Sequence, residues 1–240
     1  MLRALCLTTA LLFGFIAAEA AAQDITEDRV KELVAEALRE NPELVLEALQ
    51  ALEQRQAEEQ AAAAKAALMA DRETLDRDPN APVIGNPDGD VTIVEFFDYN
   101  CPKRAMPEIE ALLAEDPKVR IVLREWPILS EGSAFAARAA LAARAQGKYF
   151  EMHDALMTMR GKLEADTVLR LADELGLDVE KLQTDMKAPE VDEHLATSMR
   201  LAEALNFNGT PSFVIGDQLL PGFVEKDELV EAITAARAAE

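Results

Sequence analysis

The chain has 240 residues, of which 45 are acidic and 24 are Lys or Arg, so its formal net charge is -21 at neutral pH. A charge of this sign repels nucleic acid and anionic lipid surfaces, which argues against binding to either of them. Half of the residues are apolar, which is enough for the core of one domain of ordinary size with an added extension.

Residues 1–22 have the pattern of a secretory signal peptide. Arg3 supplies a positive charge, residues 5–18 form an apolar stretch, and small residues follow it. The stretch is shorter than the roughly 20 residues that span a bilayer, so we expect cleavage and export. Cys6 leaves with this segment, and Cys101 becomes the only cysteine of the mature chain. An exported protein rarely keeps an unused thiol, because its compartment is oxidising.

Residues 23–78 predict an all-helical N-terminal arm. Thr26 is expected to cap the first helix, and Asn41-Pro42 separates it from a second one. Apolar residues recur at helical spacing: Val30, Leu33, Val34, Ala37, Leu38, Leu44, Val45, Ala48, Leu49 and Leu52. Residues 53–70 form helix readily but have little to bury. Pairing with copies of itself and a solvated linker helix are both open interpretations of this arm.

A stretch with two prolines, residues 78–82, marks a domain boundary, and residues 79–240 predict an α/β domain. Its first part reads as a strand at 91–97, a helix at 102–115 and a strand at 119–126. A connection of this length favours parallel strands.

A block of helices from about residue 130 to 207 interrupts the strands. The predicted helices are 133–146, 149–159, 166–175, 178–186 and 189–205, with Asp166 and Asp178 as N-caps. A hairpin of 212–215 and 218–220 and a helix at 226–238 end the chain. The order predicts a central sheet with helices on both faces and a helical insertion.

Cys101 lies between a predicted buried strand and a helix that Pro102 would open, so we expect it at the helix N-cap. The unpaired N–H groups there, together with Lys103 and Arg104, would favour a thiolate. The competing interpretation is a small, inert, buried side chain. The junction of strand, proline and basic residues favours the reactive thiol.

Two further positions suggest a site. Glu95 interrupts an apolar strand, where a carboxyl is costly unless it is neutral, paired or useful. It is either a proton relay beneath the thiol or an edge residue that points to water. Pro211 directly precedes an apolar strand in Gly209-Thr210-Pro211, which marks an edge or a special turn.

Soft side chains gather at Met152, His153, Met157 and Met159, which would suit Cu(I). Methionine is also an ordinary core residue. The interpretation as core residues is the simpler one, so the sequence predicts neither a metal site nor a cofactor.

Taken together, these motifs resemble the DsbA-like branch of the thioredoxin superfamily, the periplasmic thiol–disulfide oxidoreductases and isomerases. The resemblance rests on Val94-Glu95-Phe96-Phe97-Asp98-Tyr99, on Cys101-Pro102, on the helical block and on Gly209-Thr210-Pro211. The arm resembles that of ScsC-like copper-sensitivity suppressor proteins. The resemblance implies a periplasmic protein with an α/β thioredoxin-like fold that contains the helical insertion. It further implies that the all-helical N-terminal arm, which precedes this domain, oligomerises. It also implies that Cys101 is the attacking thiol, Glu95 the buried acid, Thr210-Pro211 a cis-proline loop, and Pro102, Thr210 and Pro211 the substrate-binding residues.

The chain departs from this family at its central motif. Members carry Cys-x-x-Cys, whereas here Cys101-Pro102 runs directly into Lys103-Arg104. The simplest alignment removes two residues, one of them the resolving cysteine. Because the second thiol resolves the mixed disulfide, the resemblance implies monothiol exchange on exported cysteine-containing proteins, with a separate membrane or soluble redox partner. A redox-inactive binding or chaperone-like protein, and a motif shortened by a sequence error, remain the alternatives.

Overall fold

The computed structural model describes residues 26–101 and 105–239. The predicted signal peptide therefore lies outside the described residues. Contacts within the chain group it into two units, the first ending at Gln54 and the second beginning at Arg55. Within the described part, none of the helices combines the length and the apolar character needed to cross a membrane.

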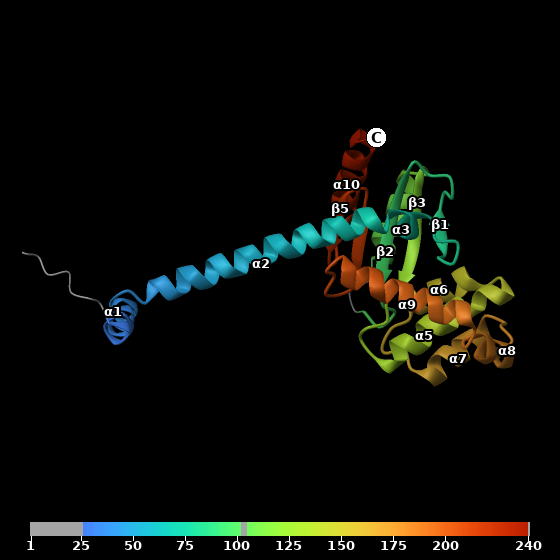
Figure 1. Cartoon of the computed structure of the whole chain (residues 1–240). Helices are drawn as coiled ribbons and strands as arrows, with labels where there is room; N and C mark the ends of the chain where they lie inside the picture. The colour runs from blue at the N-terminus through green and yellow to red at the C-terminus, as the bar shows by residue number, and fades with distance from the viewer. Residues whose placement is uncertain (1–25, 102–104, 240) are drawn as a thin grey trace, which may run out of the picture. The chain divides into compact units, whose positions relative to one another are not determined.

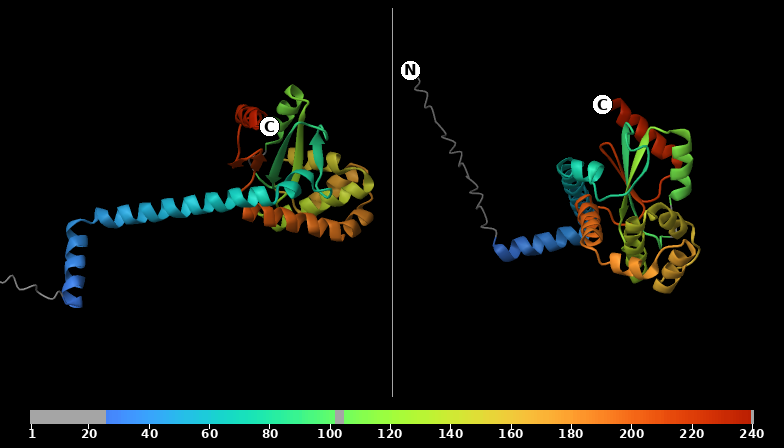
Figure 2. Two further views of the ribbon diagram at one scale, coloured as in Figure 1. Left: turned by 45° about the horizontal axis from the view of Figure 1, so that its top comes forward. Right: turned by 90° about the vertical axis from the view of Figure 1, so that its right-hand side faces the viewer.

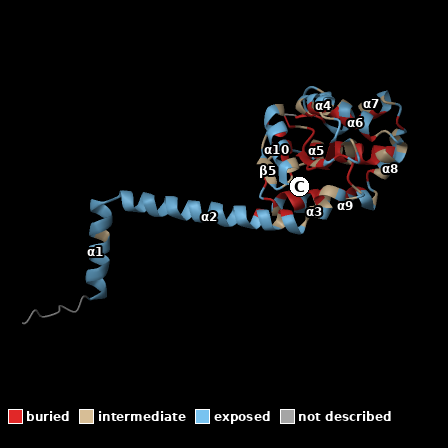
Figure 3. Ribbon diagram, turned by 90° about the horizontal axis from the view of Figure 1, so that it is seen from above, coloured by how far each residue is buried: buried red, intermediate tan, exposed pale blue. Residues whose placement is uncertain are grey.

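The first unit contains α1 (Glu27–Glu40) and the beginning of α2 (Glu43–Ala70). The predicted cap is confirmed, since Thr26 Oγ1 accepts a hydrogen bond from the Arg29 backbone N–H at 3.3 Å. None of the residues of α1 is buried (Figure 3). The large apolar side chains of this unit remain exposed, namely Val30, Leu33, Val34, Leu38, Leu44, Val45, Leu46, Leu49 and Leu52.

The second unit is built on a five-stranded sheet with the order β1-β3-β2-β4-β5 (Figure 1). The strands are β1 (Val83–Gly85), β2 (Val91–Phe97), β3 (Val119–Glu125), β4 (Ser212–Ile215) and β5 (Gln218–Pro221). As predicted, β2 and β3 are parallel and β4 and β5 form a hairpin, while β2 pairs antiparallel with β4. The sequence did not predict β1, which runs antiparallel to β3.

Helices cover both faces of this sheet (Figure 2). They are α3 (Arg72–Arg77), α4 (Met106–Glu115), α5 (Glu131–Ala142), η1 (Ala143–Gln146), α6 (Tyr149–Thr158), α7 (Ala165–Glu174), α8 (Val179–Asp185), α9 (Pro189–Ala204) and α10 (Lys226–Ala239). Apart from β1, the predicted order of strands and helices is confirmed. Two details differ: the predicted helix 133–146 divides into α5 and η1, and Glu164, not Asp166, is the N-cap of α7.

Alternate side chains of β2 enter two separate cores, as the period of two in a strand requires. Ile93 and Phe97 pack in a core with residues of α4, α10 and the helical insertion. Val94 and Phe96 pack in the other core, with residues of α3, α9 and the end of α2. Glu95 occupies the strand position between Ile93 and Phe97, so its side chain belongs to the first face.

The second core extends the larger unit beyond the predicted domain boundary at residue 79. Leu68 of α2 and Leu75 of α3 are buried among the side chains of β2, β3 and α9. Each removes a large apolar side chain from water, which favours folding by about 1.5–3 kcal/mol. The end of the predicted arm is therefore part of the core.

Candidate active site

Cys101 follows the carboxyl end of β2 and is present as a buried thiol, 7% exposed. Its backbone N–H donates to the carbonyl of Asp98 at 2.9 Å, which closes a tight turn after the strand. The prediction that Cys101 caps the next helix is wrong for α4, which begins at Met106 with Ala105 as its N-cap. Pro102, together with the basic residues 103 and 104, lies outside the described residues.

The loop before β4 contacts this cysteine, since β4 is the strand next to β2. The Thr210–Pro211 peptide bond is cis. The Cys101 Sγ donates to the Thr210 carbonyl oxygen at 3.2 Å. Residues 109 positions apart in the sequence are thus in direct contact, as expected from the family resemblance.

Glu95 lies in the middle strand of the sheet, so the alternative of an edge position is wrong. Its neighbours in register are Leu123 on β3 and Phe213 on β4. The side chain is 2% exposed, and its Oε1 has no hydrogen-bond partner among the described residues. Burial raises the pKa of Glu95 to about 8. The carboxyl therefore keeps its proton in most molecules near neutral pH.

A narrow cavity joins these groups. Its described lining residues are Glu95, Phe97, Asp98, Cys101, Ala105, Met157 and Pro211. The cavity has no room for a water molecule. Cys101, Glu95 and Pro211 therefore share a dry environment, in which electrostatic effects are stronger than in water. The start of α4 also borders this cavity through Ala105.

The residues weighed as copper ligands are mostly core residues. Met152 and Met157 are buried, and Met159 packs against the same core. The His153 Nδ1 lies 2.9 Å from the Tyr99 hydroxyl, and its ring stacks on Tyr149. Burial lowers the pKa of His153 to about 4. No group of three or more His, Cys, Asp or Glu side chains within residues 26–101 and 105–239 could hold a metal ion.

Three polar residues directly before Cys101 were not predicted as site residues, although Asp98 and Tyr99 belong to the motif that carries the family resemblance. Asp98 accepts the backbone N–H groups of Ile128 and Leu129, each at 2.9 Å. Tyr99 contacts His153 of α6, and Asn100 bonds to residues of α5 and of the loop before α7. Apart from that motif, the only signal for them was that they directly follow the predicted strand. Their partners outside this turn lie 30 to 63 positions away.

A second buried polar cluster lies at the end of β3. The Glu125 Oε2 is 2.7 Å from the His194 Nε2, and its Oε1 accepts from the Tyr149 hydroxyl at 2.6 Å. Burial works to raise the pKa of Glu125, but the His194 ring 2.7 Å away and the hydrogen bond from the Tyr149 hydroxyl hold it below its ordinary value. Glu125 is therefore a charged, paired carboxylate.

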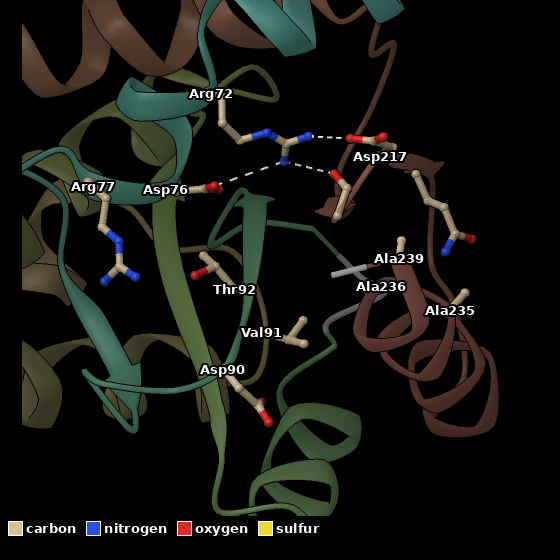
Figure 4. Close-up of a pocket in the computed structure, with 12 residues that line it drawn as sticks. Arg72, Asp76, Arg77, Asp90, Val91, Thr92, Asp217, Ala235, Ala236 and Ala239 are labelled. Carbon is tan, nitrogen blue, oxygen red and sulfur yellow. Dashed lines mark hydrogen bonds and ion pairs between the residues drawn. The ribbon is translucent and has the colours of Figure 1, made fainter.

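A surface pocket of about 390 Å³ lies at the opposite end of β2 (Figure 4). Val91 at the start of the strand lines it, whereas Cys101 follows the end of the strand. Seven residues of strand separate the two ends by roughly 20 Å. The pocket therefore does not belong to the thiol site.

The charges around this pocket are already engaged with one another. Arg72 bonds to Asp217 at 2.6 Å and to the Gly216 carbonyl at 2.8 Å, and Figure 4 shows it between Asp217 and Asp76. Asp90 pairs with Arg237 at 2.7 Å. These contacts tie α3 and α10 to the sheet, so a structural role explains them.

Two family models match the chain. Residues 92–234 match the DSBA-like thioredoxin domain. Residues 27–59 match the N-terminal domain of the copper resistance protein ScsC. The first match covers more than half of the chain and includes Glu95, Cys101 and Pro211.

Solved structures agree with these matches. A thioredoxin-like oxidoreductase from Silicibacter pomeroyi DSS-3 is 63% identical, with 70% of this chain and 99% of that chain covered and a TM-score of 0.69. A linker-deletion variant of ScsC from Proteus mirabilis is 27% identical, with 93% and 100% covered and a TM-score of 0.67. The thiol-disulfide exchange protein alpha-DsbA2 from Wolbachia pipientis is 27% identical, with 72% and 95% covered and a TM-score of 0.66.

Curated relatives match part of this chain over about a quarter of their own length. The Na(+)/H(+) antiporter NhaA 3 of Salinispora tropica is 30% identical over 164 residues, which are 66% of this chain and 25% of the antiporter. The chain thus spans about a quarter of the length of such relatives. The family-model and structure matches confirm the fold class that the sequence predicted, including the N-terminal helices.

Proposed function

Because the chain belongs to the DsbA-like thioredoxin family of thiol–disulfide oxidoreductases, we propose that it exchanges disulfides with exported proteins, with Cys101 as the attacking thiol. One observation carries this proposal: the Cys101 Sγ lies 3.2 Å from the carbonyl oxygen of Thr210, which precedes a cis proline. A client backbone that approaches Thr210 and Pro211 would bring its disulfide next to the thiol.

The proposed chemistry is limited to a single thiol. The Cys101 thiolate attacks one sulfur of a client disulfide, a protein–client S–S bond forms, and the other client sulfur leaves as a thiolate. The Cys101 sulfur is oxidised as the leaving sulfur is reduced. A further thiolate, from the client or from a separate redox partner, must then attack the client sulfur and expel Cys101. The first source gives isomerisation and the second gives net exchange.

Glu95 is proposed to act as the buried acid of this cycle. Its pKa of about 8 keeps it protonated at neutral pH, and it lines the same dry cavity as the thiol. A neutral carboxyl can donate a hydrogen bond or a proton to the Cys101 thiolate when that group is expelled from a mixed disulfide. A charged carboxylate in the same place would instead repel the thiolate.

Two assays on disulfide-containing substrates test the role of Cys101: reduction of native insulin and refolding of a protein with scrambled disulfides. We expect Cys101→Ser to abolish insulin reduction in glutathione buffer and the refolding of a scrambled disulfide protein. Unchanged refolding by this variant would contradict the proposal. Protection of clients from aggregation by the same variant would instead support the chaperone-like alternative.

We further propose that the protein acts in the periplasm after removal of residues 1–22, and that its N-terminal helices join copies of the chain. The exposed apolar side chains of α1 and α2 support the second point, since a stripe of this kind favours association. The double variant Leu38→Glu and Leu49→Glu should reduce the mass found by light scattering to that of one chain. The matched exposed change Glu58→Gln should leave the mass as it is in the wild type. Identical masses in all three proteins would contradict the oligomer.

A further inference from the structure

The turn that carries the cysteine is attached to the helical insertion by successive side chains. The Asp98 carboxylate accepts two backbone N–H groups from residues 128–129. The Tyr99 hydroxyl lies 2.9 Å from the His153 Nδ1 of α6. Each contact links the end of β2 to a part of the chain at least 30 positions further on. The position of Cys101 is thereby coupled to the insertion.

Asn100 makes the most extensive of these attachments. Its Oδ1 accepts the Leu163 backbone N–H at 2.7 Å, and its Nδ2 lies 3.3 Å from the Leu163 carbonyl oxygen. The amide thus pairs with both polar groups of one peptide segment, as a neighbouring strand would. The Nδ2 also lies 3.1 Å from the Ser130 Oγ and 3.3 Å from the Ser133 Oγ, at the start of α5.

The residues around Asn100 are packed so closely that Gly132 has no room for a side chain. A Cβ on Gly132 of α5 would lie 2.0 Å from the Leu163 carbonyl oxygen and 3.4 Å from the Asn100 Nδ2. Only glycine allows α5 to approach Leu163 this closely. Helix α5, Leu163 and Asn100 therefore form one interlocked contact directly beside Cys101.

We propose that Asn100 is a positioning residue for Cys101: its amide fixes the backbone ahead of the thiol against the helical insertion and so holds the Sγ at the Thr210 carbonyl. This inference rests on the proposed function, because it takes Cys101 as the nucleophile. The physical reason is that a nucleophile reacts fast only when it is held in an attacking geometry, and a misplacement of about 1 Å costs roughly 100-fold in rate. Neither Leu163 nor the two serines line the thiol cavity among its described residues, so Asn100 acts through the backbone.

The chain contains a matched control. The Gln146 amide makes the same pair of bonds with the backbone of Asp178, donating to its carbonyl at 3.1 Å and accepting its N–H at 2.9 Å. This pairing also lies within the insertion, and Gln146 does not line the thiol cavity. Gln146→Ala therefore removes the same two bonds between an amide and a backbone segment, at a more exposed position, without touching the segment before Cys101.

The test measures mixed-disulfide formation with dithiodipyridine, a small disulfide, in the full chain carrying Cys6→Ser, from pH 5 to about 9, a range that spans ordinary thiol titration. We expect Asn100→Ala to lower the rate by about tenfold or more. We also expect it to change the midpoint of the pH profile of this rate, because the thiol then loses its fixed contact with the Thr210 carbonyl. Gln146→Ala should leave the rate within about twofold and the midpoint unchanged. Equal rates and equal midpoints for Asn100→Ala and Gln146→Ala would overturn the inference.

Two further variants keep the test decisive if Asn100→Ala folds poorly. Asn100→Asp keeps the acceptor for the Leu163 N–H and should have an intermediate rate. Gly132→Ala displaces Leu163 from the opposite side and should reproduce the slow rate without any change in residues 98–101. Wild-type rates in both would overturn the inference.

A client protein assayed in parallel separates this inference from the proposed function. Slow client exchange by the wild type, together with the Asn100 effect on dithiodipyridine, would contradict the function and support the positioning role. Fast client exchange that is the same in the wild type and Asn100→Ala would support the function and overturn the positioning role.

Discussion

Two buried glutamates on neighbouring strands have opposite surroundings. Glu125 ends β3 and has His194 at 2.7 Å and the Tyr149 hydroxyl at 2.6 Å. Glu95 lies inside β2, and its Oε1 has no partner in the described part of the chain. The same burial therefore yields a pKa below the ordinary value for Glu125 and a pKa of about 8 for Glu95.

The difference shows which carboxyl maintains the fold and which can take part in chemistry. A paired, hydrogen-bonded carboxylate is stable in its charged form, so it does not exchange a proton near neutral pH. An unpartnered carboxyl beside a thiol changes charge within the working pH range, at a cost in stability. In the proposed function, Glu95 is the carboxyl that lowers the stability of the fold and takes part in the chemistry.

The largest expected effect is on the pH dependence of stability through Glu95. In the folded state the group keeps its proton up to about pH 8, and in the unfolded state it loses it near 4.5. The protonated Glu95 side chain makes its full contribution to the stability of the fold below pH 4.5. This contribution is lost as the pH rises to about 8, because the unfolded chain releases the proton and the folded chain does not. Over this range the wild type should lose roughly 5 kcal/mol of unfolding free energy relative to Glu95→Gln.

Urea unfolding of the two proteins between pH 4 and about 9, a range that includes both titrations, measures this difference. The exposed variant Glu110→Gln serves as the control, and its stability should follow the wild type at every pH. Parallel curves for the wild type and Glu95→Gln would show that Glu95 is not held neutral by the fold.

The second effect concerns the paired carboxylate. His194→Ala leaves Glu125 buried without the ring that lies 2.7 Å from its Oε2, which should reduce the unfolding free energy by about 3–5 kcal/mol at neutral pH. Because the pKa of Glu125 is lowered in the fold, its contribution is present above pH 4.5 and is lost as the pH falls further. The acid-side loss of stability should therefore be smaller in His194→Ala than in the wild type. A loss under about 1 kcal/mol at neutral pH would mean that the pair is not important to the fold.

The smallest effect comes from an ion pair of similar length at the surface. The Lys181 Nζ lies 2.6 Å from the Asp185 Oδ2 on α8, where both side chains contact water. Lys181→Ala should lower the unfolding free energy by only about 0.3–0.5 kcal/mol, and less in high salt. Thermal or urea unfolding in low and high salt measures it. An effect as large as that of His194→Ala would contradict the view that burial, not distance, separates these pairs.

The sequence predicted those parts of the molecule that have local signals. Strand 91–97 was predicted with the bounds observed for β2, since its apolar run is bounded by polar residues on both sides. The three-residue β1 was missed because a strand this short has no periodicity of its own. The start of α4 was misplaced because Pro102 and Pro107 both fit the first turn of a helix.

Site residues could be predicted only where a local sequence motif marked them. Cys101, Glu95 and Pro211 were marked by their place in the chain, the family resemblance gave them roles, and the structure brings all three to one cavity. Asn100 was missed because its partner Leu163 lies 63 positions away and neither residue belongs to a periodic pattern. His194 was missed for the same reason, since its contact with Glu125 joins α9 to β3.

The central claim, that Cys101 attacks disulfides and cannot resolve them alone, has a direct test. The full chain with Cys6→Ser is mixed with an excess of a disulfide-bonded peptide, and mass spectrometry and released thiol are followed over time. We expect one peptide thiol released per chain, a matching adduct at Cys101, and no further turnover until glutathione is added. Repeated turnover without added thiol, or the absence of any adduct at Cys101, would contradict the monothiol mechanism.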